Sequence, residues 1–237
     1  MMQGLQTMDY KLEVLDAEAL QKLDLRAFRS DLRRVFDASI PWENPQYDTA
    51  FQDQYVEHVK IAVFVRDAAA TPLALSIAFI EDIPDGVMLY IAGVWVDHAC
   101  KSRGLGKLVL TSLIRHATQS MEACLKPVYI ALRTQNPRLY SWFARRYDIY
   151  PHRNKIAPHD IRAVAAFVHA RFSPAKIYEP ERMVVRCAFP RGIVVGHLHP
   201  SRNDDDQRFV CDHLNIAEGD SYIVAFRFGD MQSAGEP

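Results

Sequence analysis

Two features that would assign a protein class at once are missing from this sequence: a charge excess and a long apolar run. The 28 Lys and Arg residues nearly balance the 29 Asp and Glu residues, so the formal net charge is -1. This balance argues against electrostatic binding of nucleic acid, which requires a basic excess. No apolar stretch approaches the roughly 20 residues needed to cross a bilayer. We therefore expect a protein that binds neither nucleic acid nor a membrane.

Cysteine is sparse and scattered. The four positions form no Cys-x-x-Cys pair and lie far apart: Cys100, Cys124, Cys187 and Cys211. This spacing argues against a disulfide framework and a redox motif, and we expect reduced, half-buried thiols. The first residues also lack the charged and then apolar order of a signal peptide. We therefore expect a cytoplasmic protein.

A convincing set of metal ligands is also lacking. His197 and His199 would place two imidazoles on one strand face, with His213 on the following helix. However, no cysteine or carboxylate stands at ligand spacing beside them, and Pro200 ends the segment. We expect no metal ion.

What the chain does contain is enough apolar sequence for a full core, and one segment with clear local order. It has 237 residues, of which 49% are hydrophobic. Residues 87–96 (VMLYIAGVWV) are mostly β-branched and aromatic, which predicts a strand buried on both faces. Apolar residues at helical spacing then predict a helix: Val109, Leu110, Leu113, Ile114 and Ala117.

The connection between this strand and this helix carries two glycines, Gly104 and Gly106, and three cations, Lys101, Arg103 and Lys107. The unpaired N–H groups and the positive dipole end of a helix together form an anion-binding site. Glycine has no Cβ to keep a phosphate away from the backbone. The segment therefore predicts a pyrophosphate-binding loop.

Spacing excludes two common phosphate-binding loops. A Walker-type loop needs a glycine five positions before its glycine–lysine pair, but Lys101 stands there and Leu108 follows the pair. A dinucleotide fingerprint needs a third glycine three residues after the second, where this chain has Val109. Nucleotide hydrolysis and hydride transfer are therefore not predicted.

The loop resembles that of the GNAT acyltransferase superfamily, which reads Gln/Arg-x-x-Gly-x-Gly/Ala after the central strand. Here the pattern is Lys101, Ser102, Arg103, Gly104, Leu105 and Gly106, preceded by Val94 and Val96. Lys101 departs from the usual Gln or Arg but still supplies a cation. The resemblance covers residues 11–150 well and the remainder loosely. It implies an α/β (α+β) fold with a central mixed, mostly antiparallel sheet flanked by helices, and acetyl-CoA or another acyl-CoA as co-substrate.

A second part of the pattern lies downstream. Residues 128–132 predict another buried strand, and Asn136 followed by Pro137 predicts a helix start. In the superfamily an Asn here contacts the pantetheine arm, and the following helix carries an aromatic residue. The resemblance thus implies these cofactor-binding residues in addition to the six of the loop pattern: Val94, Trp95, Val96, Lys107, Asn136 and Phe143.

The other expected elements follow the order of the superfamily core. We expect strands at residues 10–15, 60–66, 73–80, 183–189 and 221–228, and helices at residues 20–36, 49–58, 159–172 and from 203 onward. They predict a single domain, with a core at about residues 10–150 and a C-terminal part at residues 151–230. The helix at 159–172 exceeds the minimal core. It either covers one end of the sheet or forms an acceptor-pocket wall or a dimer surface.

The leaving thiol of an acyl transfer needs a proton donor. In many superfamily members a Tyr seven residues after the Asn serves as this acid, but Phe143 stands there. Tyr140 lies one helical turn earlier, and we predict it as the substitute. The alternative is that Tyr140 only packs against the sheet.

The attacking amine must lose a proton to a base. Some superfamily members carry a Glu where this chain has Tyr90. Glu81 and Asp82 end the neighbouring strand, and we predict Glu81 as the base because we expect it to lie nearest the substrate cleft. Asp82, Asp97 and His98 are the alternatives.

The resemblance implies an acyl-CoA-dependent N-acyltransferase, most simply an acetyltransferase that acts on an amine of a small molecule or a protein in a ternary complex. Two alternatives stay open: a non-catalytic acyl-CoA sensor with this fold, and an enzyme with a longer acyl donor. The expected partners are acyl-CoA and an amine acceptor, and a homodimer is compatible with the sequence. No sequence motif identifies the amine acceptor.

Overall fold

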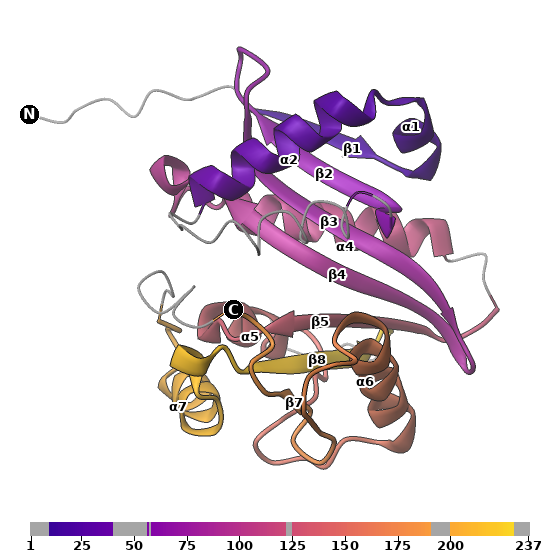
Figure 1. The fold of residues 1–237 in the computed structure, drawn as a ribbon, viewed down its shortest axis with the longest axis vertical. Helices are drawn as coiled ribbons and strands as arrows, with labels where there is room; N and C mark the ends of the chain where they lie inside the picture. The colour runs from indigo at the N-terminus through magenta and orange to yellow at the C-terminus, as the bar shows by residue number, and fades with distance from the viewer. Residues whose placement is uncertain (1–9, 40–55, 57, 122–124, 191–199, 230–237) are drawn as a thin grey trace, which may run out of the picture. The chain divides into compact units, whose positions relative to one another are not determined.

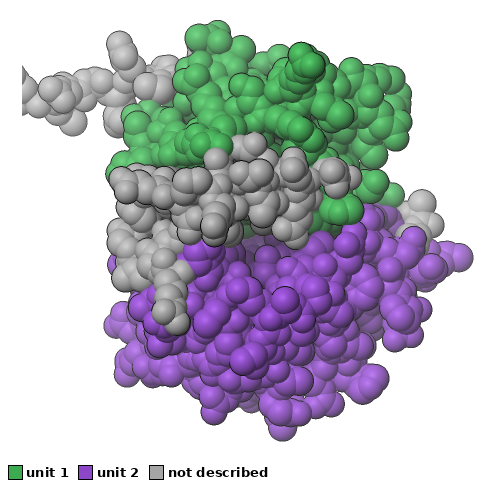
Figure 2. Space-filling model, in the orientation of Figure 1, with its two compact units in different colours: residues 1–79, 92–120 green, residues 80–91, 121–237 purple. Residues whose placement is uncertain are grey.

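The structure is a computed structural model that describes residues 10–39, 56, 58–121, 125–190 and 200–229. The chain divides into two compact units (Figure 2). The first comprises residues 1–79 and 92–120, and the second comprises residues 80–91 and 121–237. Strands β3 (Pro72–Ile83) and β4 (Gly86–Val96) contribute residues to both units. The single domain expected from the sequence stays a prediction.

Within the described residues, eight strands form one sheet in the order β1-β2-β3-β4-β5-β8-β7-β6. The remaining strands are β1 (Lys11–Leu15), β2 (Ile61–Arg66), β5 (Val128–Thr134), β6 (Tyr178–Glu179), β7 (Val184–Val185) and β8 (Ser221–Arg227). Strands β4 and β5 pair in parallel, whereas β1–β2, β2–β3, β5–β8, β7–β8 and β6–β7 pair antiparallel. The predicted mixed, mostly antiparallel sheet is therefore confirmed.

The first unit carries the helices α1 (Ala17–Lys22), α2 (Leu25–Ser39) and α4 (Leu105–Met121) (Figure 1). The single helical stretch expected at residues 20–36 is wrong, because the backbone is extended at Leu23. Asp24 then accepts a hydrogen bond from the amide of Arg26 at 2.8 Å, which restarts the helix. Helix α2 buries one apolar face, and its Phe28 meets Phe64 of β2 edge to face at 6.0 Å.

The turn between β2 and β3 has an alanine in the left-handed region, with φ of +61° at Ala70. Asp67 holds this turn, because its side-chain oxygen accepts hydrogen bonds from the amides of Ala69 (2.9 Å) and Thr71 (2.8 Å). An L-residue with a Cβ is strained in this conformation, whereas glycine adopts it freely.

We expect Ala70→Gly to raise the free energy of unfolding by up to about 1 kcal/mol, because it removes this strain. Urea unfolding of the variant measures the change. Ala69→Gly is the matched control and is expected to lower stability, since Ala69 does not have a positive φ. Equal shifts in the two variants would contradict the strain argument.

The second unit carries the helices α5 (Pro137–Ala144), α6 (His159–Phe172) and α7 (Asp204–His213). Helix α6 has the predicted bounds and packs on β5 and β8, while α7 packs on α5 (Figure 1). The predicted acidic helix start is confirmed, because the Asn203 side chain accepts from the amides of Asp205 and Asp206.

Two expected elements differ from the structure or lie outside it. The strand expected at residues 183–189 contracts to β7 (Val184–Val185), because Met183 and Cys187 have positive φ angles of 54° and 48° that end the extended backbone. The short strand β6 was not predicted. The helix expected at residues 49–58 lies almost entirely outside the described residues. No helix in the described part of the chain is long and apolar enough to cross a membrane.

Candidate functional site

The connection from β4 to α4 turns sharply at two positions. A short 3-10 helix (His98–Cys100) follows β4, and then Ser102 and Gly104 have φ angles of +68° and +81°. Helix α4 begins at Leu105, and the amide of Leu108 donates to the carbonyl of Gly104 at 3.0 Å. The amides of residues 105–107 precede this first intrahelical bond. They are therefore the groups that a helix start offers to an anion.

Gly104 and Gly106 are each required in the loop for a different structural reason. A Cβ added to Gly104 would meet nothing within 4 Å, so the space beside this residue is open. A Cβ added to Gly106 would lie 3.3 Å from Cγ2 of Val96 and 4.0 Å from Cγ1 of Val94. Gly106 thus lets α4 pack closely on β4, whereas Gly104 permits the turn and leaves its outer side open.

The charge around the loop is positive. Arg103 and Lys107 are exposed, Lys101 is half-buried, and the first turn of α4 has no acidic residue. Nη1 of Arg103 donates to the hydroxyl of Tyr10 at 3.3 Å, which holds the guanidinium beside the loop. Helix amides and nearby cations together favour a phosphate group.

The last part of β4 has a distinct environment on each face. Val94 and Val96 point toward α4, as their distances to Gly106 show. The Trp95 ring lies over Gly93 on the opposite face and meets Phe36 of α2 at 5.8 Å. The ladder between β4 and β5 ends at the pair Ile91 and Leu132, although β4 continues to Val96.

In the second unit, Asn136 begins α5 as predicted. Its Oδ1 accepts from the amides of Arg138 (3.0 Å) and Leu139 (3.4 Å), and Pro137 occupies the first helical turn. Oγ1 of Thr134 accepts from the amide of Asn136 at 3.0 Å. Because the cap uses the side-chain oxygen, the NH₂ group of Asn136 is the part that can donate to a ligand.

Tyr140, the predicted acid, is buried at 2% exposure. Its hydroxyl donates to the carbonyl of Pro151 at 2.9 Å, and its ring packs on Phe209 and Tyr222. Burial and the nearby charge of Asp206 raise the pKa of Tyr140 far above its ordinary value. These contacts favour a packing role, and the catalytic role stays a prediction.

Phe143 is fully buried, with its ring 5.7 Å from Phe226 of β8 and 6.1 Å from Tyr147. It therefore belongs to the core of the second unit. Its assignment to the cofactor remains a prediction from the resemblance.

Glu81, the predicted base, lies in β3 with its side chain 24% exposed. Its carboxylate is 3.7 Å from Nε of Arg171 in α6. Of the alternatives, Asp82 is 85% exposed and lies 3.7 Å from Lys126. Asp97 accepts a hydrogen bond from the amide of Ala99 at 2.8 Å.

Arg133, which no sequence pattern singled out, joins three elements. Its Nε donates to the hydroxyl of Tyr90 at 3.0 Å, and its Nη1 donates to Oγ of Ser173. The Tyr90 ring also stacks on Phe172 at 4.1 Å. Tyr90 therefore links β4, β5 and the end of α6 at the position where some family members carry Glu. The partners are 40 or more residues apart, so no local pattern signals them.

Gln135 was also missed. It follows β5 directly and is 4% exposed, and neither its side-chain oxygen nor its side-chain nitrogen has a hydrogen-bond partner among the described residues. Both atoms are shielded from solvent. Buried amide groups are normally hydrogen-bonded, so the absence of a partner in the described residues needs an explanation.

The cysteines and histidines show no assembled metal site in the described ranges, where no group of three potential ligands converges. His197 and His199 lie outside these ranges, and Nδ1 of His213 lies 2.7 Å from the carbonyl of Phe209. Cys100, Cys187 and Cys211 are free thiols, whereas Cys124 is not described. Burial raises the pKa of Cys100, so its thiol stays protonated.

Comparison with solved structures gives several acetyltransferases at low similarity, while no curated protein matches the sequence. An aminoglycoside N-acetyltransferase AAC(6')-Iy in complex with CoA is 12% identical, with a TM-score of 0.39 over 58% of this chain and 84% of that chain. The NatC complex bound to Gag peptide and CoA is 12% identical, with a TM-score of 0.42 over 92% and 98% of the two chains. Glucosamine-6-phosphate N-acetyltransferase from Arabidopsis thaliana is 17% identical, with a TM-score of 0.35 over 52% and 81%. TM-scores this low carry no argument about substrate.

A family model gives a clearer result. The model of the Acetyltransferase (GNAT) family matches residues 21–148, which is more than half of the chain. The match runs from α1 past the end of α5 and includes the loop between β4 and α4. The chain therefore belongs to the Acetyltransferase (GNAT) family.

Proposed function

We propose that this protein is an acyl-CoA-dependent N-acyltransferase that moves an acetyl group from acetyl-CoA to an amine of a small molecule or a protein. The observation that carries the proposal is the loop of residues 101–107, at the start of α4 and within the matched region. Family membership supports this class of activity in general. The acetyl donor and the direct attack in a ternary complex are our finer proposals.

The loop fits the pyrophosphate of coenzyme A in three respects. The side of Gly104 is open, so a phosphate can approach the backbone there. The amides of residues 105–107 lie at the helix start, and three cations surround them. From the resemblance, the backbone of Val94, Trp95 and Val96 and the NH₂ group of Asn136 would bind the pantetheine arm.

Bound acyl-CoA would supply an activated thioester carbonyl. The amine nitrogen attacks this carbon, so that a C–N bond forms and the C–S bond breaks. One proton leaves the nitrogen for a base, and the thiolate takes up one proton from an acid. Glu81 is our candidate for the base. Tyr140 is the acid predicted from the sequence, but its buried hydroxyl is engaged by the carbonyl of Pro151, so we propose that water supplies this proton.

Tyr140→Phe separates the two roles of this tyrosine. The variant leaves the Pro151 carbonyl without its donor, so we expect stability to fall by about 1–2 kcal/mol. Because the hydroxyl is engaged and buried, we expect kcat to change by less than about threefold, whereas loss of a general acid typically costs 100-fold or more. Thiol release and urea unfolding measure the two effects. A large fall in kcat with unchanged stability would instead establish Tyr140 as the acid.

The function itself is tested by thiol release from acetyl-CoA against a panel of small amines and peptides. We expect saturable protection by CoA against heat, and free thiol only when an acceptor amine is present. The acyl-CoA sensor is the second candidate, since Phe143 has no hydroxyl and the hydroxyl of Tyr140 is engaged. Protection by CoA without thiol release across the whole panel would favour the sensor, and no protection would refute both candidates.

A further inference from the structure

The side chain of Gln135 stands at the point where β5 ends and α5 begins. The residues before and after it, Thr134 and Asn136, are both fixed by hydrogen bonds. Thr134 pairs with Tyr222 of β8, and its Oγ1 accepts from the amide of Asn136 at 3.0 Å. The side-chain oxygen of Asn136 in turn caps α5. Gln135 therefore lies on backbone fixed by its neighbours, which is the arrangement expected of a preorganised binding residue.

The side-chain amide of Gln135 has unused hydrogen-bonding capacity among the described residues. A buried glutamine brings one acceptor oxygen and two N–H donors, and neither the oxygen nor the nitrogen of Gln135 has a partner in the described part of the structure. A shielded polar group without a partner destabilises the fold, because folding removes its hydrogen bonds to water. A leucine of similar size would avoid this cost. The glutamine is thus best explained by a ligand that satisfies it.

The group that complements a primary amide at both ends is another amide, which offers one N–H and one C=O. The pantetheine arm of coenzyme A contains two amides, whereas its nucleotide contains none. The adjacent Asn136 offers only its NH₂ group, because its oxygen is engaged in the helix cap. An amide N–H of the arm therefore needs an acceptor from elsewhere. The oxygen of the neighbouring Gln135 is an acceptor with no partner in the described ranges.

We propose that Gln135 is a binding residue for the pantetheine arm, whose oxygen accepts from an amide N–H of the arm and whose NH₂ group donates to an amide C=O. The inference rests on the proposed use of coenzyme A. To the contacts proposed above for the pantetheine arm, Gln135 adds a side chain that both donates and accepts hydrogen bonds. Side chains that cover the amide of Gln135 must move when the arm binds, since the amide is shielded from solvent.

The test measures binding by calorimetry with two ligands, CoA and adenosine 3′,5′-bisphosphate, which lacks the arm. We expect Gln135→Leu to weaken CoA binding about tenfold, the loss expected for a pair of neutral hydrogen bonds. Affinity for the bisphosphate is expected to stay unchanged. The ligand-free melting temperature of Gln135→Leu is expected to equal or exceed that of the wild type, because an unsatisfied buried amide is removed.

A second substitution of Gln135 and a control substitution elsewhere complete the binding test. Gln135→Met repeats the test with a flexible apolar side chain, should leucine not be accommodated. Ser221→Ala is the matched control, because Oγ of Ser221 on β8 is likewise buried with no hydrogen-bond partner among the residues described. We expect this control to leave CoA affinity unchanged.

The outcomes separate this inference from the proposed function. If the wild type binds CoA but both Gln135 variants bind it equally well, the inference is overturned and the proposed function stands. The inference is also overturned if the variants weaken CoA and the bisphosphate by the same factor. If the wild type does not bind CoA, the proposed function fails and the inference fails with it.

Discussion

Gly104→Glu is expected to abolish measurable CoA binding, with a loss of affinity of about 100-fold or more. The structure gives two reasons. The side of Gly104 is open, so a new side chain would extend into the space that a phosphate would occupy. The carboxylate would also place negative charge beside the helix start, where three cations favour an anion. Calorimetric titration with CoA measures the effect.

Gly104→Gln is the matched control for this prediction. Glutamine has the same size as glutamate and suffers the same backbone strain at a φ of +81°, but it carries no charge. We therefore expect equal losses of stability in the two variants and a much smaller loss of CoA affinity in Gly104→Gln. Unchanged CoA affinity in Gly104→Glu would remove the loop from the cofactor site. Equal affinity losses in both variants would show that strain or bulk, and not charge, is responsible.

Asp220→Ala is expected to lower the free energy of unfolding by about 3–5 kcal/mol, because it removes a buried carboxylate that accepts hydrogen bonds from a guanidinium and two amides. The Asp220 side chain is 4% exposed, and one of its oxygens accepts from Nη1 of Arg186 (2.5 Å) and from the amide of Asn215 (3.0 Å). The other oxygen accepts from the amide of Cys187 at 3.0 Å. The substitution therefore leaves a guanidinium and two amides without their acceptor.

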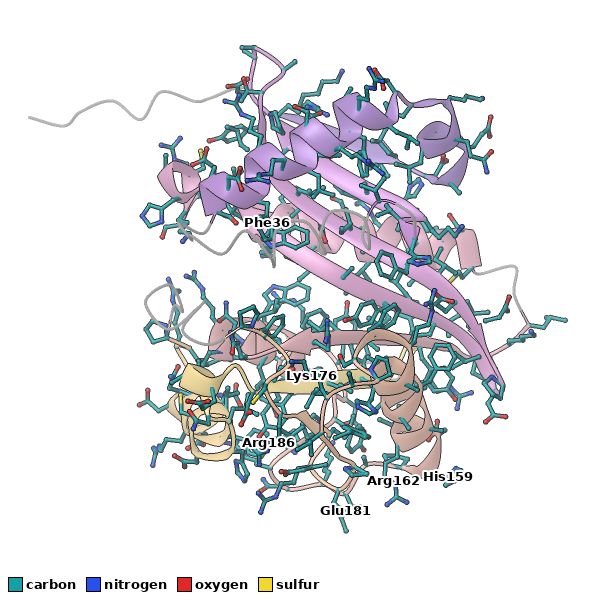
Figure 3. All side chains as sticks on the ribbon, in the orientation of Figure 1. Phe36, His159, Arg162, Lys176, Glu181 and Arg186 are labelled. Atoms are coloured by element: carbon teal, nitrogen blue, oxygen red, sulfur yellow. The ribbon has the colours of Figure 1, made fainter. Side chains whose placement is uncertain are left out.

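Arg186 adds to the expected effect because it joins separate parts of the second unit (Figure 3). Its Nε lies 2.6 Å from the carboxylate of Glu179 on β6. Hydrogen bonds to Glu179 and Asp220 raise the pKa of Arg186 above its ordinary value, so the guanidinium stays charged at any working pH. Without Asp220, this charge loses its most buried partner.

Urea unfolding at neutral pH measures the loss, and Arg182→Ala is the surface control. Arg182 lies 4.0 Å from Glu179 with its side chain 61% exposed, so its removal is expected to cost at most about 0.5 kcal/mol. Asp220→Asn should fall between these two, because the amide oxygen can still accept a hydrogen bond but carries no charge. An effect of Asp220→Ala no larger than that of Arg182→Ala would show that the network adds little stability.

Much of the fold was predictable because its signals act within a few residues. Asn136 and Asn203 begin helices through side-chain oxygens that reach amides two or three positions away. The apolar runs of β4, β5 and α6 have the period of their element, and the two glycines mark the turn into α4. The prediction of a strand over residues 183–189 was wrong because Met183 and Cys187 adopt the left-handed conformation, which ends the extended backbone. A sequence normally signals this conformation with glycine, and neither residue is a glycine.

In the candidate site, too, features made by neighbours in the chain were predictable from the sequence, whereas contacts between distant segments were not. The sequence by itself determined the loop of residues 101–107 and the helix start at Asn136, because each is made by neighbours in the chain. Only the tertiary structure decided that the hydroxyl of Tyr140 is engaged by Pro151 and that Arg133 holds Tyr90. It also decided that the amide of Gln135 is buried with no hydrogen-bond partner in the part of the chain that the structure describes. Hydrogen-bond partners and burial depend on which distant segments the fold brings together, and no local spacing records them.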